Sequence, residues 1–96
     1  MNKSFSFSIQ ADIHSNWSSE ILEMENITED EASEILEALV LEGELLLYEN
    51  MEGNVTVDEE NSEVYGDYRG WSENEEEWLG EPETFSIDLD VIMSWS

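Results

Sequence analysis

The chain has 96 residues, 26 of them Asp or Glu and only two Lys or Arg, so its formal charge at neutral pH is −24. Its length suits one domain over residues 1–96, and 40% hydrophobic residues supply a core that a disordered acidic tail lacks. The charge excludes direct binding to nucleic acid or anionic lipid, because phosphates are repelled, and the absence of Cys excludes disulfides and thiolate metal sites.

The first segment, residues 4–14, alternates apolar and polar side chains. Alternation of this length predicts a strand with one buried and one wet face, which suits an antiparallel sheet. The face expected to be buried carries Phe5, Phe7, Ile9, Ala11 and Ile13.

Two helices are predicted next, a short one near residues 18–25 and a longer one at about 28–42. The short helix is indicated by apolar residues at helical spacing, namely Trp17, Ile21 and Met24. The longer one begins with a capping box formed by Thr28 and Glu31 and ends before Gly43. Its apolar stripe consists of Ala32, Ile35, Leu36, Leu39 and Val40.

Residues 44–59 predict a hairpin with strands near 44–51 and 54–59, because Gly53 and Asn54 are typical turn residues. A weaker strand is indicated by Val64, Tyr65 and Tyr68. A third, short helix is predicted near 72–79, where Ser72 and Glu75 form a capping box and Gly80 and Pro82 follow.

The last segment, residues 85–95, alternates like the first and predicts a strand that includes Asp88 and Asp90 on its polar face. Its apolar face is expected to carry Phe85, Ile87, Leu89, Val91, Met93 and Trp95. We therefore expect an α+β fold in which an antiparallel sheet of four to five strands, including both terminal segments, is covered by the long helix.

Catalysis and metal binding find weak support in the sequence. His14 is the only histidine, and its neighbour Asp12 on the same strand face is better explained as part of a solvated surface. Residues 58–68 are acidic but lack the spacing of an EF-hand loop. We expect no enzyme activity, no dedicated metal site and no cofactor.

Acidic residues lie at regular spacings on two predicted elements. Asp30, Glu34 and Glu37 form a stripe on the long helix, with neighbours about 5–6 Å apart. On the last predicted strand, Asp88 and Asp90 are about 6.6–6.8 Å apart. Successive phosphates along one nucleic-acid strand are separated by roughly 6–7 Å, so such rows can imitate a phosphate track.

Between Asp58 and Glu83 there are 11 acids in 26 residues, with four aromatic residues among them. These are Tyr65, Tyr68, Trp71 and Trp78. Aromatic rings are enriched where interfaces carry their binding energy, and they also accept Lys and Arg through cation–π contacts. The alternative is that Trp71 and Trp78 cover the core.

In size, extreme negative charge, lack of Cys and acidic rows, the chain resembles the small acidic DNA-mimic inhibitors of phages and mobile elements, such as anti-restriction and anti-CRISPR proteins. The resemblance implies an inhibitor that occupies the basic nucleic-acid-binding cleft of a bacterial defence protein. We expect it to be cytoplasmic, because the sequence has neither the continuous apolar run of a signal peptide nor the roughly 20 apolar residues of a membrane span. An acidic module that shields a basic protein, and a Ca²⁺-dependent domain, are the alternatives. The residues expected to bind the partner are Asp30, Glu34, Glu37, Asp58, Glu59, Glu60, Glu63, Asp67, Trp71, Glu73, Glu75, Glu76 and Glu77.

Overall fold

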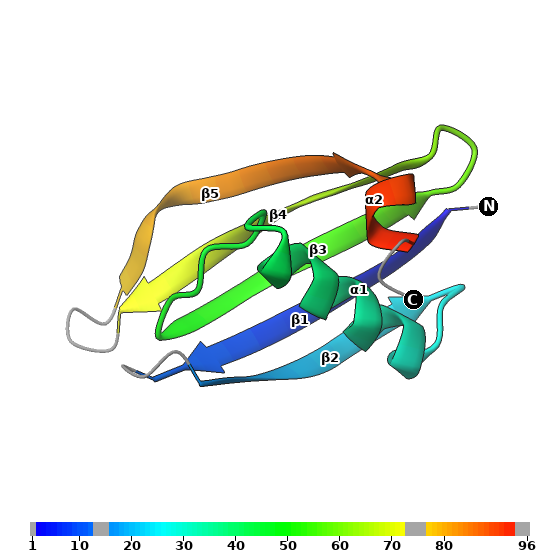
Figure 1. Ribbon diagram of the computed structural model, residues 1–96. Coiled ribbons are helices and arrows are strands. Elements are labelled where there is room, and N and C mark those ends of the chain that lie inside the picture. Colours follow the sequence, from blue (N-terminus) through cyan, green and yellow to red (C-terminus); the bar gives the residue numbers. More distant parts are fainter. Residues whose placement is uncertain (1, 13–15, 73–76, 94–96) are drawn as a thin grey trace.

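The computed structural model describes residues 2–12, 16–72 and 77–93, and these form a five-stranded antiparallel sheet with two helices (Figure 1). The strand order is β2-β1-β3-β4-β5. The α+β class and the antiparallel sheet predicted from the sequence are confirmed. In chain order the elements are β1 (Lys3–Ala11), β2 (Trp17–Glu25), α1 (Glu29–Leu41), β3 (Asn50–Asp58), β4 (Glu63–Ser72), β5 (Glu77–Asp88) and α2 (Leu89–Met93).

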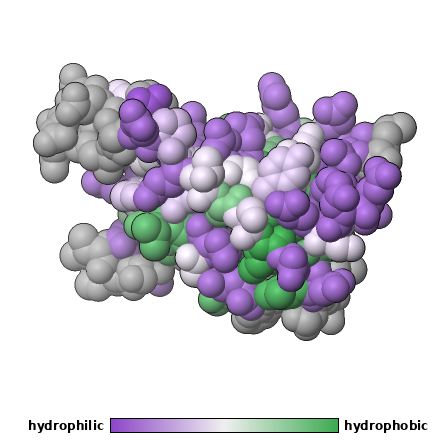
Figure 2. All heavy atoms as spheres, turned by 90° about the horizontal axis from the view of Figure 1, so that it is seen from above, coloured by the Kyte–Doolittle hydropathy of each residue, from purple (hydrophilic) through white to green (hydrophobic). Residues whose placement is uncertain are grey.

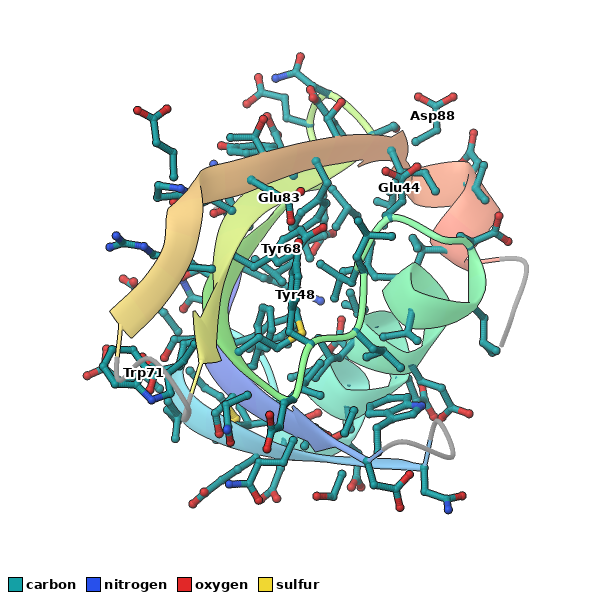
Figure 3. The ribbon with its side chains drawn as sticks, turned by 90° about the vertical axis from the view of Figure 1, so that its left-hand side faces the viewer. Glu44, Tyr48, Tyr68, Trp71, Glu83 and Asp88 are labelled. Carbon is teal, nitrogen blue, oxygen red and sulfur yellow. The ribbon has the colours of Figure 1, made fainter. Side chains whose placement is uncertain are left out.

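Both helices and the segment 42–49 lie on one face of the sheet, which curves around them (Figures 1 and 3). The chain leaves β2 at the sheet edge, crosses this face in α1 and returns in β3, so that β1 lies between β2 and β3. Phe5, Phe7 and Ile9 of β1 are buried under α1, as their alternation predicted. The core therefore lies between the sheet and the helices.

The helix α1 begins and ends as its sequence predicts. Thr28 caps it, because its Oγ1 accepts a hydrogen bond from the Glu31 amide at 3.2 Å. At the other end Gly43 adopts a φ of +79°, which favours glycine, and the Gly43 and Glu44 amides donate to carbonyls of the last turn. The side chains that α1 buries are Ala32, Ile35, Leu36, Ala38 and Leu39.

The predicted helix near residues 18–25 is wrong, because this segment is the edge strand β2. A bulge explains the misleading spacing. The register between β1 and β2 shifts between Ser6 and Phe7, so that Ile21 lies opposite Phe7 while Met24 lies opposite Phe5. Ile21 and Met24, three positions apart, are thus both cross-strand neighbours of buried residues of β1. A spacing of three residues is more typical of a helix than of a strand.

The predicted hairpin at 44–59 is also wrong. Residues 50–58 form one continuous strand, β3, paired with β1 on one side and β4 on the other. A Cβ atom on Gly53 would lie 2.7 Å from the Tyr68 Cβ and 2.8 Å from the Phe7 ring. The glycine therefore permits close packing in a central strand instead of a turn.

The predicted helix near 72–79 is wrong at its described ends, because Ser72 ends β4 and Glu77 begins β5, and the two backbones pair with Trp71 opposite Trp78 and Ser72 opposite Glu77. Residues 73–76, which include Glu75 of the predicted capping box, lie outside the described residues. The weaker strand predicted around Tyr65 is confirmed as β4, and it is longer than expected. Pro82 lies in an irregular stretch of β5, where the register shifts opposite the interval from Tyr68 to Gly70. Because proline cannot donate a hydrogen bond to the ladder, it is confined within sheets to places such as bulges.

The last predicted strand ends early. β5 stops at Asp88 and the chain turns into the short helix α2, whose Leu89 amide donates to the Ser62 carbonyl at 2.8 Å. The helix buries Ile92, which strand alternation had placed on the polar face. Asp88 and Asp90 therefore lie on different elements and do not form the predicted strand pair. Trp95 lies outside the described residues.

Candidate functional site

The sheet face opposite the helices is lined by polar side chains. Across this face Ser6 lies opposite Asn54, and Asn54 lies opposite Asp67. The Asn54 Nδ2 atom is 3.5 Å from the Asp67 Oδ1 atom, at the limit of a hydrogen bond. Figure 2, which views the molecule from above relative to Figure 1, shows many hydrophilic side chains among the coloured residues and hydrophobic side chains in smaller groups.

Three acidic residues lie side by side where β3, β4 and β5 meet the β3–β4 turn and α2. Asp58 is the cross-strand partner of Glu63, and Glu63 is the partner of Asp88. We call Asp58, Glu63 and Asp88 the acidic row. Directly opposite residues have Cα atoms about 4.5–5.5 Å apart, and like charges in these positions destabilise a sheet.

Asp58 is held in its charged form by the turn that follows it. The Asn61 side chain donates to Asp58 Oδ2 at 2.7 Å, and the Asn61 amide donates to Oδ1 at 3.2 Å. These hydrogen bonds hold the pKa of Asp58 below its ordinary value, the side-chain bond being the larger cause. The turn thus fixes the position of the carboxylate at one end of the acidic row by two hydrogen bonds.

A groove of about 440 Å³ lies on the other side of the sheet, between α1, α2 and the strands β1 and β3. We call it the helical groove. Its apolar lining consists of Ile35, Ala38, Leu41, Val57, Leu89 and Ile92. Its acidic lining consists of Glu31, Glu34, Glu37 and Glu59. The volume lies within the usual range of ligand pockets, about 300–1,000 Å³.

Lys3 crosses this groove and joins two acidic elements. Its Nζ lies 2.8 Å from Glu31 Oε1 on α1 and 3.2 Å from Glu59 Oε1 in the β3–β4 turn. The hydrogen bonds to Glu31 and then to Glu59 raise the pKa of Lys3, so the ammonium group stays charged. One of the two cations in the chain therefore serves an internal contact.

Two tyrosines, Tyr48 and Tyr68, lie inside the curve of the sheet, and the sequence pattern indicates no role for Tyr48. Tyr48 donates to Glu83 Oε2 at 2.9 Å, and the Leu46 amide donates to the Tyr68 hydroxyl at 3.2 Å. The hydrogen bond to Glu83 raises the pKa of Tyr48, and burial raises that of Tyr68. Raised values keep both phenols protonated, so the cluster fits a structural role rather than that of a phenolate nucleophile.

The structure separates the predicted partner-binding residues into several groups. Glu34, Glu37 and Glu59 come together in the helical groove, with Asp30 exposed on the same helix. Asp58 and Glu63 belong to the acidic row, and Glu60 is exposed in the turn between them.

The remaining predicted residues lie elsewhere. The half-buried Trp71 points to the sheet face opposite Tyr48 and Tyr68 (Figure 3). Asp67 lies on that same face, opposite Asn54. Glu77 begins β5. Glu73, Glu75 and Glu76 lie outside the described residues.

Glu31, Leu41 and Lys3 line the helical groove, although the sequence predicts no binding surface for them. The pattern around Glu31 indicates only a capping residue, and Lys3 is one of only two bases. Nothing in the local pattern indicates that α1, the β3–β4 turn and α2 enclose one groove, because residues from Lys3 to Ile92 contribute to it.

Neither helix in the described part of the chain is long and apolar enough to cross a membrane. Within residues 2–12, 16–72 and 77–93, no group of three or more His, Asp or Glu side chains is arranged to hold a metal ion. No protein-family model, curated protein sequence or solved structure matches the chain.

Proposed function

We propose that this protein is a nucleic-acid mimic that inhibits a bacterial defence protein, such as a restriction enzyme or CRISPR effector, by occupying its basic nucleic-acid-binding cleft. The observation that carries this proposal is the acidic row, in which Asp58, Glu63 and Asp88 are direct cross-strand neighbours. Placing like charges opposite one another destabilises the sheet. A row of like charges that opposes folding indicates a use for its charge.

The row also has a suitable geometry. Neighbouring Cα atoms in the row are about 4.5–5.5 Å apart. The Asp and Glu side chains can diverge so that their carboxylates reach the roughly 6–7 Å that separates successive phosphates. Because the chain has a formal charge of −24, the basic cleft of the partner attracts this protein over long range and aligns it at short range. Inhibition follows from occupancy alone and requires no chemistry.

The experiment is a cleavage assay in which purified restriction enzymes and CRISPR effectors act on labelled duplex DNA in the presence of this protein. We expect at least one enzyme to be inhibited at a one-to-one ratio and to recover as the concentration of the labelled duplex DNA is raised. A gel shift with this protein and DNA alone should show no complex, because the charges repel. Binding that DNA does not relieve would contradict mimicry and favour the shielding module.

A matched pair of triple variants tests the acidic row itself. The first combines Asp58→Asn, Glu63→Gln and Asp88→Asn, and the second combines Glu20→Gln, Glu23→Gln and Glu25→Gln on the exposed edge strand β2. Both remove three charges. We expect the first to weaken inhibition about tenfold or more and the second to change it little, since steering by total charge is the same in both. Equal losses would refute a specific role for the row.

A further inference from the structure

The helical groove combines an apolar floor with an acidic rim. A surface whose charges only kept the protein in solution would not need the apolar floor. Ile35, Ala38 and Ile92 form buried parts of the floor, whereas Leu41 is 58% exposed at its edge. An exposed leucine beside a buried apolar floor leaves apolar surface in contact with water. Covering that surface with a partner is favourable.

The rim carries more negative charge than the chain neutralises. Glu31 and Glu59 share the Lys3 ammonium group. Glu34 and Glu37 are exposed on α1 and have no cationic partner among the described residues. A ligand that neutralises them must be a cation, so fatty acids, phosphates and a second copy of this chain are disfavoured.

Lys3 shows the chemistry that the groove accommodates. It is one of the lining residues together with Val57, and its ammonium group lies between two rim carboxylates. An aliphatic chain against apolar residues with a cationic end at the rim is also how a Lys or Arg from another molecule would bind. The groove therefore fits a segment that carries both features.

We propose that the helical groove binds a basic amphipathic segment of the partner protein, with an apolar side chain against Leu41 and Ile92 and a Lys or Arg against Glu34 and Glu37. This inference rests on the proposed function, because it gives that partner a second contact on the helical side of the molecule. The acidic row would bind the cleft through charge, and the groove would add contact that a phosphate chain cannot make.

The test uses two fluorescent peptides of 18 residues with equal numbers of lysines, one built from Leu and Lys in an amphipathic helical pattern and one with Ser in place of Leu. We expect the Leu/Lys peptide to bind this protein about tenfold more tightly or better in anisotropy titrations at physiological salt. Equal affinities would overturn the groove proposal while leaving the mimic proposal intact. No binding of either peptide would also overturn the groove proposal, whereas the mimic proposal stands or falls by the cleavage assay.

Variants locate the binding site. Leu41→Ser should weaken the Leu/Lys peptide about tenfold without affecting the Ser/Lys peptide. Leu46→Ser is the matched control, because Leu46 is 55% exposed and does not line the groove. If the two variants behave alike, the apolar contact is not in the groove and the proposal fails.

A charge pair completes the test. Glu34→Gln with Glu37→Gln should weaken both peptides more than Glu20→Gln with Glu23→Gln on β2, although each pair removes two charges. Equal effects would show that the peptides sense only net charge and would overturn the proposal. Circular dichroism and thermal melting confirm that each variant is folded, and both substituted pairs are exposed.

Discussion

The Tyr48 hydroxyl donates a hydrogen bond of 2.9 Å to Glu83, and so joins the segment that follows α1 to the strand β5. The Tyr48 ring also lies over Gly70 of β4 and is 6.5 Å from the Tyr68 ring, centroid to centroid. These contacts hold the segment 42–49 against the inner face of the sheet (Figure 3). The Glu83 carboxylate, on the inner face of the sheet, is thus paired with the Tyr48 hydroxyl and not with a cation.

Tyr48→Phe should lower the free energy of unfolding by about 1–2 kcal/mol, because Glu83 would lose its donor in a partly buried site. Urea unfolding of the wild type and the variant measures the difference. Tyr65→Phe is the control, since Tyr65 lies on the opposite face and is 37% exposed, and it should change stability little. Equal effects of the two substitutions would show that the contact with Glu83 contributes nothing.

The same contact predicts a loss of stability at alkaline pH. The hydrogen bond to Glu83 raises the pKa of Tyr48 above its ordinary value of 10.0, so the folded state keeps a proton that the unfolded state releases. The contribution to stability is complete below pH 10.0 and falls as the pH rises through the folded pKa. The free energy of unfolding, measured from about pH 8 to about pH 11, should therefore decline more steeply in wild type than in Tyr48→Phe. Parallel curves would disprove this linkage.

Gly70→Ala should destabilise the fold by about 1–3 kcal/mol, because the new methyl group meets the Tyr48 ring. A Cβ atom there would be 2.8 Å from Cγ and 2.9 Å from Cδ2 of that ring. Chemical unfolding measures the cost, and the double variant with Tyr48→Ala completes a cycle. The cost of Gly70→Ala should shrink once the ring is removed, and an unchanged cost would place the strain elsewhere.

Asn61→Ala should raise the pKa of Asp58 toward its ordinary value, because the variant loses the larger of the two hydrogen-bond effects on that carboxylate. In wild type the depressed pKa of Asp58 stabilises the folded state at pH values above the pKa of the unfolded state. This stabilisation is lost as the pH falls through the pKa of the folded state. Carboxyl ¹³C titration by NMR measures the shift. Asn54→Ala is the control, since Asn54 contacts Asp67 instead. A pKa of Asp58 that stays depressed in Asn61→Ala would refute the assignment.

Repulsion along the acidic row should weaken with salt. We expect the melting temperature to rise between about 10 and about 300 mM NaCl, because counter-ions screen the charges. Glu63→Gln should stabilise the isolated protein by up to about 1 kcal/mol at low salt, since it removes the middle charge. The gain should diminish in high salt. A wild-type melting temperature that stays flat or falls would contradict the electrostatic account.

Local signals in the sequence predicted α1 and β1 well. Thr28, Glu31 and Gly43 define the helix by contacts within a few residues, and the alternation of Phe5, Phe7 and Ile9 needs only one buried face. The same local logic failed where tertiary pairing decides the structure. A bulge gave β2 an apolar spacing typical of a helix, and Gly53 resembled a turn although it lies in a central strand.

The candidate site was less predictable than the fold. The sequence indicated acidic residues such as Asp58 and Glu63, but their alignment with Asp88 depends on the register of three strands. A shift of one residue would turn each side chain to the other face. The helical groove depends on α2, which alternation predicts as part of a strand, so the sequence does not indicate that apolar residues such as Ile35 and Leu89 line one groove.

The position of β1 between β2 and β3 has a consequence for the order of folding. β1 pairs with β2 through a short connection, and β3, β4 and β5 form a meander of neighbours, but Lys3 must find Val57 to join these two parts. Long-range closure of this kind slows folding, because chain entropy is lost before contacts compensate for it. We expect the contacts of the β1–β3 seam to form last, after the rate-limiting transition state. Substitutions such as Val55→Ala would then slow refolding less than they accelerate unfolding.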